Sequence, residues 1–225
     1  MPLTCFVNCG AWEDRPIGNL IRLLEAKGAR VFSLSEETLR LDAFATWVDS
    51  RPFVFLNGAK SAERSRFDAA HELGHLCLHL DGQKGKKVKD EANTFAAAFL
   101  MPACDVIARR VFPTMQNLID AKSRWGVALS ALLRRYRDLM LMNEERARWL
   151  YVEMARKGFL KKEPRPIQRE GSAIWTQVLQ AFWRDRMTIG DLAEELALPT
   201  DEIESPIFVK RRGLRIIPLQ QPPAP

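Results

Sequence analysis

The sequence predicts an α+β fold, in which a mostly helical domain carries a small sheet near its N-terminus and a helical appendage at its C-terminus. Short runs of β-branched and aromatic residues are confined to residues 30–56. From residue 61 onward, apolar residues recur every three or four positions, as on the buried face of a helix. The 225 residues, 47% hydrophobic and 28% charged, suffice for a folded core and exclude a disordered or collagen-like chain.

The first part of the chain is predicted to contain a helix followed by two or three strands. Residues 17–28 have apolar residues at helical spacing and end at Gly28, a residue type common just after a helix. Residues 30–34 and 53–56 have strand composition, and residues 43–48 are a further candidate strand. We expect these strands to form one small sheet.

Two helices are expected next, with an exposed loop between them. Residues 61–80 contain no proline and one glycine, and their apolar spacing predicts a long helix. Residues 81–87 are rich in glycine and lysine and predict the loop. Residues 90–101 predict a second helix that ends before Pro102.

The remaining chain is predicted to be helical on both sides of a linker. A helical segment covering about 114–158 contains three predicted helices, at 115–126, 129–141 and 144–157. Residues 161–166 are charged, contain two prolines and predict the linker. The predicted domains are therefore 1–165 and a small helical region at 166–225. Helices are expected near 175–183 and 189–196 in the second region, to which we assign no role.

Composition narrows the compartment and the partners. The four cysteines form no CxxC pair and the N-terminus has no leader pattern, so we expect a reducing cytoplasm. The longest apolar run has about half of the roughly 20 residues that a membrane-spanning helix needs. The net charge is +6, and an excess of seven positive charges lies between residues 122 and 170. A charged partner, if there is one, is expected to bind there.

The sequence His71-Glu72-Leu73-Gly74-His75 lies within the predicted helix at 61–80. Residues four apart share one helix face, so His71 and His75 can present two imidazole nitrogens to one divalent ion, for which zinc is well suited. Glu72, one position further round, can accept a proton from metal-bound water and pass it to a leaving amine. The pattern predicts a zinc-dependent peptidase.

A catalytic zinc site needs a third protein ligand and one open position. His79 is the only other histidine, but it lies roughly 80° round the helix and two turns along from His71. We expect it to donate a hydrogen bond near the site or to cap the helix. A carboxylate at the start of the next helix, Asp90 or Glu91, is the better candidate.

Four segments together resemble one known family of metallopeptidases. They are RSRF at 64–67, AHELGHLCLH at 70–79, EANTFA at 91–96 and LMP at 100–102. The chain resembles the ImmA/IrrE metallo-endopeptidases over roughly residues 15–165. The resemblance implies a zincin-like domain with zinc bound by His71, His75 and Glu91, and Asp90 is the alternative to Glu91.

The resemblance also implies a substrate class. Members of this family cleave helix-turn-helix repressors of the Xre type, which control stress, phage or mobile-element genes. Many relatives carry a helix-turn-helix domain of their own, whereas about fifteen residues precede the peptidase-like helix here, so we expect a repressor that acts in trans. Asp68 stands where a small hydroxyl or apolar residue is expected.

Several assignments stay open at this level. Asn93 either orients a metal ligand or satisfies backbone groups of its own helix. Tyr136, Tyr151 or an arginine could stabilise an oxyanion, although core packing is the default for both tyrosines. The alternative function is a non-catalytic or weakly catalytic zinc-containing module that binds DNA or a partner protein. The basic residues that would grip DNA are Arg134, Arg135, Arg146 and Arg148.

Overall fold

The computed structural model describes residues 15–34, 43–79 and 85–174, together with seven single positions between 177 and 194. The helices expected near 175–183 and 189–196 otherwise lie outside the described residues, as do Cys5 and Cys9. In the described part the α+β class is confirmed. Its elements are α2 (Leu20–Ala26), β1 (Arg30–Leu34), β2 (Phe44–Val48), β3 (Arg51–Asn57), α3 (Ala62–Leu78), α4 (Lys86–Leu100), α5 (Ala103–Ala108), α6 (Met115–Lys122), α7 (Leu129–Asp138) and α8 (Glu144–Arg156).

The three predicted strands form one sheet in which β3 is central. β3 pairs in parallel with β1 and antiparallel with β2, so the candidate strand at 43–48 is confirmed. Val54 and Leu56 of β3 are buried on the face that meets the helices, whereas Phe53 and Phe55 alternate to the other face. There Phe32 of β1 stacks on both phenylalanine rings. The alternation fixes which face of the sheet covers the core.

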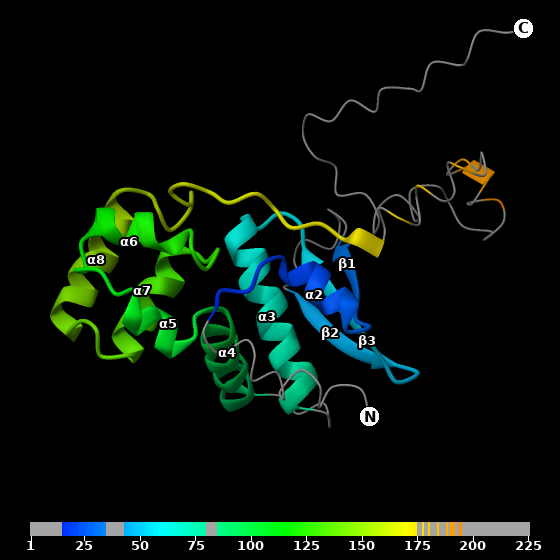
Figure 1. Cartoon of the computed structure of the whole chain (residues 1–225), viewed down its shortest axis with the longest axis horizontal. Coiled ribbons are helices and arrows are strands. Elements are labelled where there is room, and N and C mark those ends of the chain that lie inside the picture. The colour runs from blue at the N-terminus through cyan, green and yellow to red at the C-terminus, as the bar shows by residue number, and fades with distance from the viewer. Residues whose placement is uncertain are drawn as a thin grey trace, which may run out of the picture.

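Helices α2 and α3 lie beside the sheet, α2 near β1 and α3 against β2 and β3 (Figure 1). Asn19 caps α2 by accepting a hydrogen bond from the Arg22 N–H at 2.9 Å. The helix is shorter than the predicted 17–28 and ends at Ala26, and Gly28, two residues later, has a φ of +91°, in the region that glycine adopts readily. Ser61 caps α3 in the same way through the Arg64 N–H.

Helix α4 starts at Lys86, earlier than the predicted position 90. The part of the expected loop that contains Lys86 and Lys87 is therefore helical, since lysine is a good helix former and Gly85 precedes the first turn. α4 packs closely against α3. A Cβ atom added to Gly74 would lie 3.1 Å from the Phe95 ring and 3.3 Å from the Ala92 Cα. The glycine in the histidine motif thus permits the close helix crossing.

The helices after Pro102 form a second half of the molecule (Figure 1). The short helix α5 is absent from the sequence prediction, in which Pro102 marks only the end of the preceding helix. In the structure Pro102 also occupies the N-cap position of α5. The predicted helices at 115–126, 129–141 and 144–157 are confirmed as α6, α7 and α8, each somewhat shorter than expected. No helix among the described residues is long and apolar enough to cross a bilayer.

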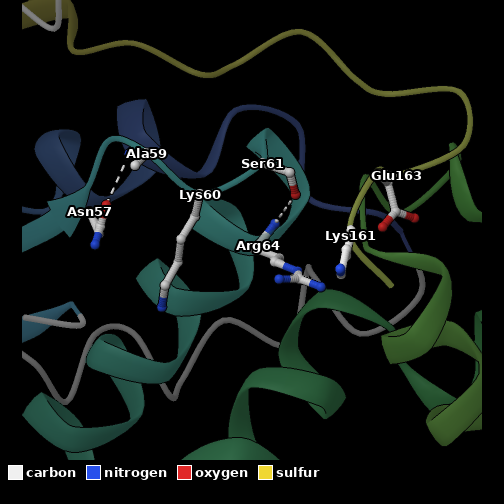
Figure 2. Close-up of a pocket in the computed structure, with 7 residues that line it drawn as sticks. All are labelled: Asn57, Ala59, Lys60, Ser61, Arg64, Lys161 and Glu163. Atoms are coloured by element: carbon white, nitrogen blue, oxygen red, sulfur yellow. Dashed lines mark hydrogen bonds between the residues drawn. The ribbon is translucent and has the colours of Figure 1, made fainter. Parts of the chain in front are cut away.

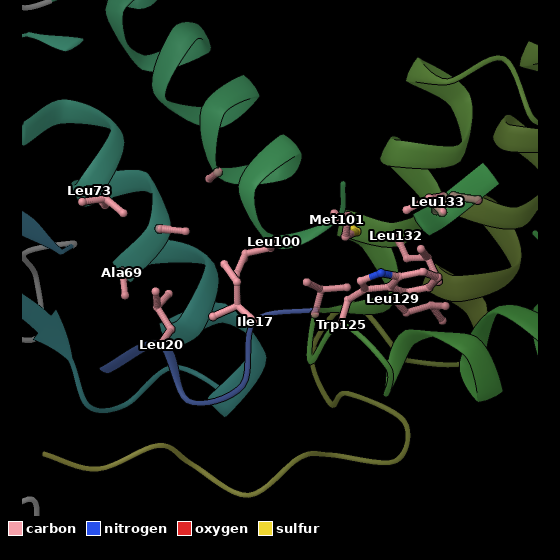
Figure 3. Packing of buried hydrophobic residues seen from close by; sticks show 14 of the residues in the cluster. Ile17, Leu20, Ala69, Leu73, Leu100, Met101, Trp125, Leu129, Leu132 and Leu133 are labelled. Atoms are coloured by element: carbon pink, nitrogen blue, oxygen red, sulfur yellow. The ribbon is translucent and has the colours of Figure 1, made fainter. Parts of the chain in front are cut away.

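One hydrophobic core runs through both halves. In Figure 3, Trp125 lies on the side of the helical half that is nearer Ile17 and Leu100, and its side chain is 1% exposed. Leu100 and Met101, at the end of α4, join the two sides and are fully buried. The cluster shown includes Ile17, Leu20, Ala69, Leu73, Leu129, Leu132 and Leu133. The position of α3, and so of its histidines, depends on this shared core.

Residues 163–174, which we call the strap, return from the helical half past the start of α3 to the sheet side (Figure 1). The strap begins at a buried ion cluster. Lys122, fully buried, lies 3.1 Å from Glu63 Oε1 and 3.4 Å from Glu163 Oε1. Its ammonium also donates to the Arg165 carbonyl at 3.1 Å. The segment expected to be a linker is therefore held by buried contacts.

The far end of the strap is attached to α2 and α3. The buried Arg66 of α3 pairs with the Glu170 carboxylate, which also accepts hydrogen bonds from the Leu20 and Ile21 N–H groups at 2.9 and 3.2 Å. Glu25, near the other end of α2, accepts from the Ala173 N–H at 2.8 Å. The strap thus joins the first helix of the described chain to the helix that carries the histidine motif.

Candidate metal centre

Helix α3 brings His71 and His75 together as the spacing predicted. Their Nε2 atoms lie 3.0 Å apart, and their rings meet edge to face with centroids 4.7 Å apart. Two nitrogens at about 2.0–2.1 Å from a tetrahedral zinc ion would lie about 3.3–3.4 Å apart. The observed pair is therefore close to the separation that a shared metal requires.

Both rings favour the neutral form, which is the form that binds metals. Burial lowers the pKa of His71 below its ordinary value. Burial, followed by the neighbouring His71 and His79 rings, lowers the pKa of His75 to about 4. At neutral pH the two imidazoles are uncharged, and a nitrogen lone pair on each is available.

Glu72 follows His71 on the same helix and is only 6% exposed. A carboxylate in this position is shielded from bulk water, as a proton-transfer group in a peptidase needs to be. Asp90 and Glu91 are both exposed, on the first turns of α4. The four predicted site residues His71, Glu72, His75 and Glu91 therefore come from two packed helices, α3 and α4.

The Glu91 carboxylate contacts His79, which in turn contacts His75. Its Oε2 atom lies 2.9 Å from His79 Nε2, and His79 Nδ1 lies 3.2 Å from His75 Nδ1. The hydrogen bond with His79 lowers the pKa of Glu91, so this carboxylate is ionised at neutral pH. His79 has the expected hydrogen-bonding role, and its partner is the carboxylate predicted as the third ligand.

Among the described residues, no three or more histidine, cysteine, aspartate or glutamate side chains are grouped closely enough to hold a metal ion. Two of the expected ligands converge, while Glu91 is engaged with His79. The donor chemistry nevertheless fits a zinc or similar ion, because two neutral imidazoles and an ionised carboxylate lie on adjoining helices. To bind the metal, the Glu91 side chain would have to give up its hydrogen bond with His79 and turn towards His71 and His75.

Asn93 and Asp68 both raise the pKa of His71. A side-chain hydrogen bond with Asn93 of α4 acts against the effect of burial and raises the pKa of His71, which favours an orienting role for Asn93 over a purely local one. Asp68, one turn before His71, acts in the same direction. The Lys60 ammonium lies 2.7 Å from the Asp68 carboxylate and partly neutralises it. Sequence reasoning missed Lys60, since no local spacing links it to the motif.

An open groove of about 850 Å³ runs along α4 past Glu91. Apolar side chains dominate its surface, and the charged residues that line it come from the first turns of α4. Such a surface, beside the carboxylate predicted as the third metal ligand, can accept an extended peptide. The groove is lined by Leu78, Lys86, Lys87, Asp90, Glu91, Thr94, Phe95 and Ala98.

The tyrosines considered as oxyanion donors have partners in the helical half. Tyr136 is fully buried and its hydroxyl accepts from the Val111 N–H at 3.1 Å. The Tyr151 hydroxyl donates to the Ser130 carbonyl at 3.3 Å. Arg135, half-buried, donates to the Met101 carbonyl at 3.0 Å. Burial raises the pKa of the Cys77 thiol to about 11, so this cysteine stays protonated as a core thiol.

Comparison with known families gives one match. Residues 24–137 match the model of the Peptidase_M78 family, described as an IrrE N-terminal-like domain. The match begins in α2 and ends in α7, so it contains the sheet, both site helices and all four predicted site residues. No curated protein matches the chain.

Proposed function

Since this chain belongs to the IrrE N-terminal-like peptidase family, we propose that it is a zinc-dependent endopeptidase. In this proposal His71, His75 and Glu91 bind the metal and Glu72 is the general base. The observation that carries it is the close approach of the His71 and His75 Nε2 atoms, 3.0 Å apart, on neutral rings. A pair of partly buried, neutral imidazoles beside a buried glutamate is what hydrolysis at a metal needs.

When bound, the metal ion polarises the substrate carbonyl and makes water more acidic. Glu72 removes a proton from the attacking water as the oxygen bonds to the carbonyl carbon. It then delivers that proton to the amine nitrogen as the carbon–nitrogen bond breaks, so the carboxylate is regenerated. Its burial keeps the proton from exchanging with bulk water during the reaction.

The proposed substrate is a helix-turn-helix repressor of the Xre type, supplied by a separate chain. The family membership supports a protein substrate, and the open, largely apolar groove beside Glu91 offers a surface for an extended segment of one. A single regulatory cut, rather than general protein degradation, is the activity we propose.

The test is incubation of the chain with an Xre-type repressor encoded by a neighbouring gene, with added zinc or with a chelator. We expect one discrete cut, identified by mass spectrometry of the products, that the chelator abolishes. Glu72→Gln should lower the rate by at least about a hundredfold, because the proton-transfer group is lost while the metal ligands remain. Cleavage by Glu72→Gln at the rate of the unaltered chain would refute the mechanism.

The zinc content of variants distinguishes the proposed metal ligands from the neighbouring His79. His71→Ala should lose stoichiometric zinc, measured by elemental analysis after gel filtration, and Glu91→Ala should weaken zinc binding. His79→Ala is the matched control on the same helix, and we expect it to retain zinc. Equal zinc loss from His79→Ala and His71→Ala would assign His79 to the metal instead. Salt-dependent DNA binding without any cut would favour a non-catalytic regulatory module.

A further inference from the structure

A second cavity, of about 240 Å³, lies where β3 ends and α3 begins (Figure 2). It is separate from the candidate metal centre, because His71 lies seven residues, or about 10 Å, beyond Arg64, the lining residue furthest along α3. Two segments that are distant in sequence form it. The segment from β3 to α3 supplies Asn57, Ala59, Lys60, Ser61 and Arg64, and the turn after α8 and the strap supply Lys161 and Glu163.

Three of the lining residues are cationic, and one of the three is already neutralised. Lys60 pairs with Asp68 at 2.7 Å, and in Figure 2 its ammonium points away from Arg64. Arg64 donates to the Leu160 carbonyl at 2.5 Å, which fixes its position but leaves its charge uncompensated. Within the described part of the chain, no ion pair is seen for Arg64 or Lys161.

The single carboxylate that lines the cavity does not neutralise these two cations. Glu163 is engaged with Lys122 at 3.4 Å and accepts from the Leu129 N–H at 2.6 Å. Burial also raises the pKa of Glu163 above its ordinary value. In Figure 2 the Arg64 guanidinium extends towards the Lys161 ammonium, while Glu163 lies beyond both. Two cations on one cavity repel each other unless an anion lies between them.

The volume of the cavity limits the size of the anion that it can hold. Pockets for drug-sized ligands have volumes of about 300–1,000 Å³, so this one fits a small group. Guanidinium and ammonium groups bind the oxygens of phosphate with strong, charge-assisted hydrogen bonds. The 17-residue helix α3 begins at the cavity, and the positive end of its dipole adds to the attraction.

We propose that this cavity binds a phosphate group between Arg64 and Lys161, either as free inorganic phosphate or as the exposed phosphate of a larger molecule. The ligand would connect the turn after α8 to the first turn of the helix that carries His71. The phosphate would therefore stabilise the attachment of the helical half to α3. The site does not depend on the proposed peptidase activity, and its occupancy can be measured without a substrate.

The test is thermal unfolding and isothermal titration calorimetry with inorganic phosphate, at an ionic strength held constant with sodium chloride. We expect phosphate, but not chloride, to raise the melting temperature of the unaltered chain. Arg64→Gln and Lys161→Gln should each weaken phosphate binding about tenfold or more, since each removes a charge-assisted hydrogen bond. Both side chains lie at exposed positions, so the folded state should survive, as circular dichroism would check.

Lys162→Gln is the matched control, because Lys162 is exposed, adjacent in sequence and absent from the cavity lining. It should bind phosphate as the unaltered chain does. A loss equal to that of Lys161→Gln would mean non-specific attraction to positive charge and would overturn the proposal. So would the lack of any stabilisation by phosphate beyond that by chloride.

A second ligand distinguishes the two sources of the phosphate group. Adenosine 5′-monophosphate is titrated in parallel with inorganic phosphate, on the same variants. Tighter binding of the nucleotide identifies a phosphate carried by a larger molecule, whereas binding of inorganic phosphate alone identifies the free ion. Nucleotide binding that survives both Arg64→Gln and Lys161→Gln would place it elsewhere and would count against the site.

Discussion

At the residue scale, the central feature is the row of three histidines on one face of α3. His75 lies in the middle, with Nε2 facing His71 and Nδ1 facing His79. Protonation of the central ring would place a positive charge within about 3 Å of both neighbours, in a partly buried site where such a charge is poorly solvated. The arrangement therefore favours the uncharged ring before any metal binds.

This feature predicts an unusual titration of His75. In the metal-free chain its pKa is lowered to about 4, below the unfolded value of about 6.5. The unfolded chain thus binds a proton more readily, so the folded state loses stability as the pH falls from about 6.5 to about 4. Nuclear magnetic resonance of the imidazole protons measures the midpoint directly. A midpoint near 6.5 would show that the ring is not held as described.

At the scale of elements, the crossing of α3 and α4 sets the distance between the histidines and Glu91. Gly74 faces Phe95 and Ala92 of α4 at the closest point of that crossing. A larger residue would meet the α4 backbone, which can yield only if the whole helix moves. The position of Glu91 relative to the histidines therefore depends on a residue that has no side chain.

Gly74→Ala tests this dependence. Alanine is the better helix former by about 1 kcal/mol, but overpacking costs about 1–3 kcal/mol, so we expect a net loss of stability of up to about 2 kcal/mol. Zinc affinity should also fall as α4 shifts. Gly171→Ala is the control, since no atom lies within 4 Å of its added Cβ. Urea unfolding and zinc titration provide the measurements, and unchanged zinc affinity in Gly74→Ala would contradict the coupling.

Elements set by local spacing could be predicted from the sequence, whereas those set by distant contacts could not. The histidine helix and the three strands follow from periodicity alone. Helix α5 has only six residues and depends on Asp105, which accepts from the Trp125 indole N–H at 2.8 Å across nineteen intervening residues. No local sequence pattern predicts that contact. The start of α4 is a different case: glycine and charge favour a loop over residues 81–87, but lysine is also a good helix former, and the helix begins at Lys86.

The candidate site likewise contains residues whose proximity could be predicted from the sequence and others whose positions could not. His71, Glu72 and His75 lie within five residues of one helix, so their proximity follows from helix geometry. The position of the Glu91 side chain depends on how α4 crosses α3, and in the structure that side chain meets His79. Its role as third metal ligand stays a prediction. The Lys60 and Asp68 pair beside His71 likewise depends on the turn before α3.

At the scale of the whole molecule, the strap and its buried charges hold the two halves together. Lys122 and Glu63 are both fully buried, and Glu163 is nearly so. Buried ion pairs contribute little net stability compared with apolar residues, but the loss of one partner leaves an uncompensated charge. Lys122 is therefore the residue on which the attachment of the strap depends most.

Lys122→Met should lower the free energy of unfolding by about 3–5 kcal/mol, because two buried carboxylates lose their cation. Lys157→Met is the control: Lys157 pairs with Glu153 at 2.7 Å but is exposed, so we expect a loss below about 1 kcal/mol. Burial already raises the pKa of Glu163, and loss of Lys122 raises it further. The deficit of Lys122→Met should thus shrink as the pH falls and Glu163 is protonated. A deficit independent of pH would contradict this account.

The strap also imposes an order on biosynthesis. Glu170 accepts from N–H groups of α2 that lie 150 and 149 positions earlier in the chain, and it pairs with Arg66, which lies 104 positions earlier. Since a ribosome releases the chain from its N-terminus, α2 and α3 emerge long before these acceptors exist. Until residue 170 has left the exit tunnel, the buried Arg66 guanidinium has its carbonyl acceptors at Ile17 and Gly18 but lacks a carboxylate. Residue 170 lies beyond the end of the matched domain at residue 137, so native packing around the histidine helix is completed only after that whole domain has been made.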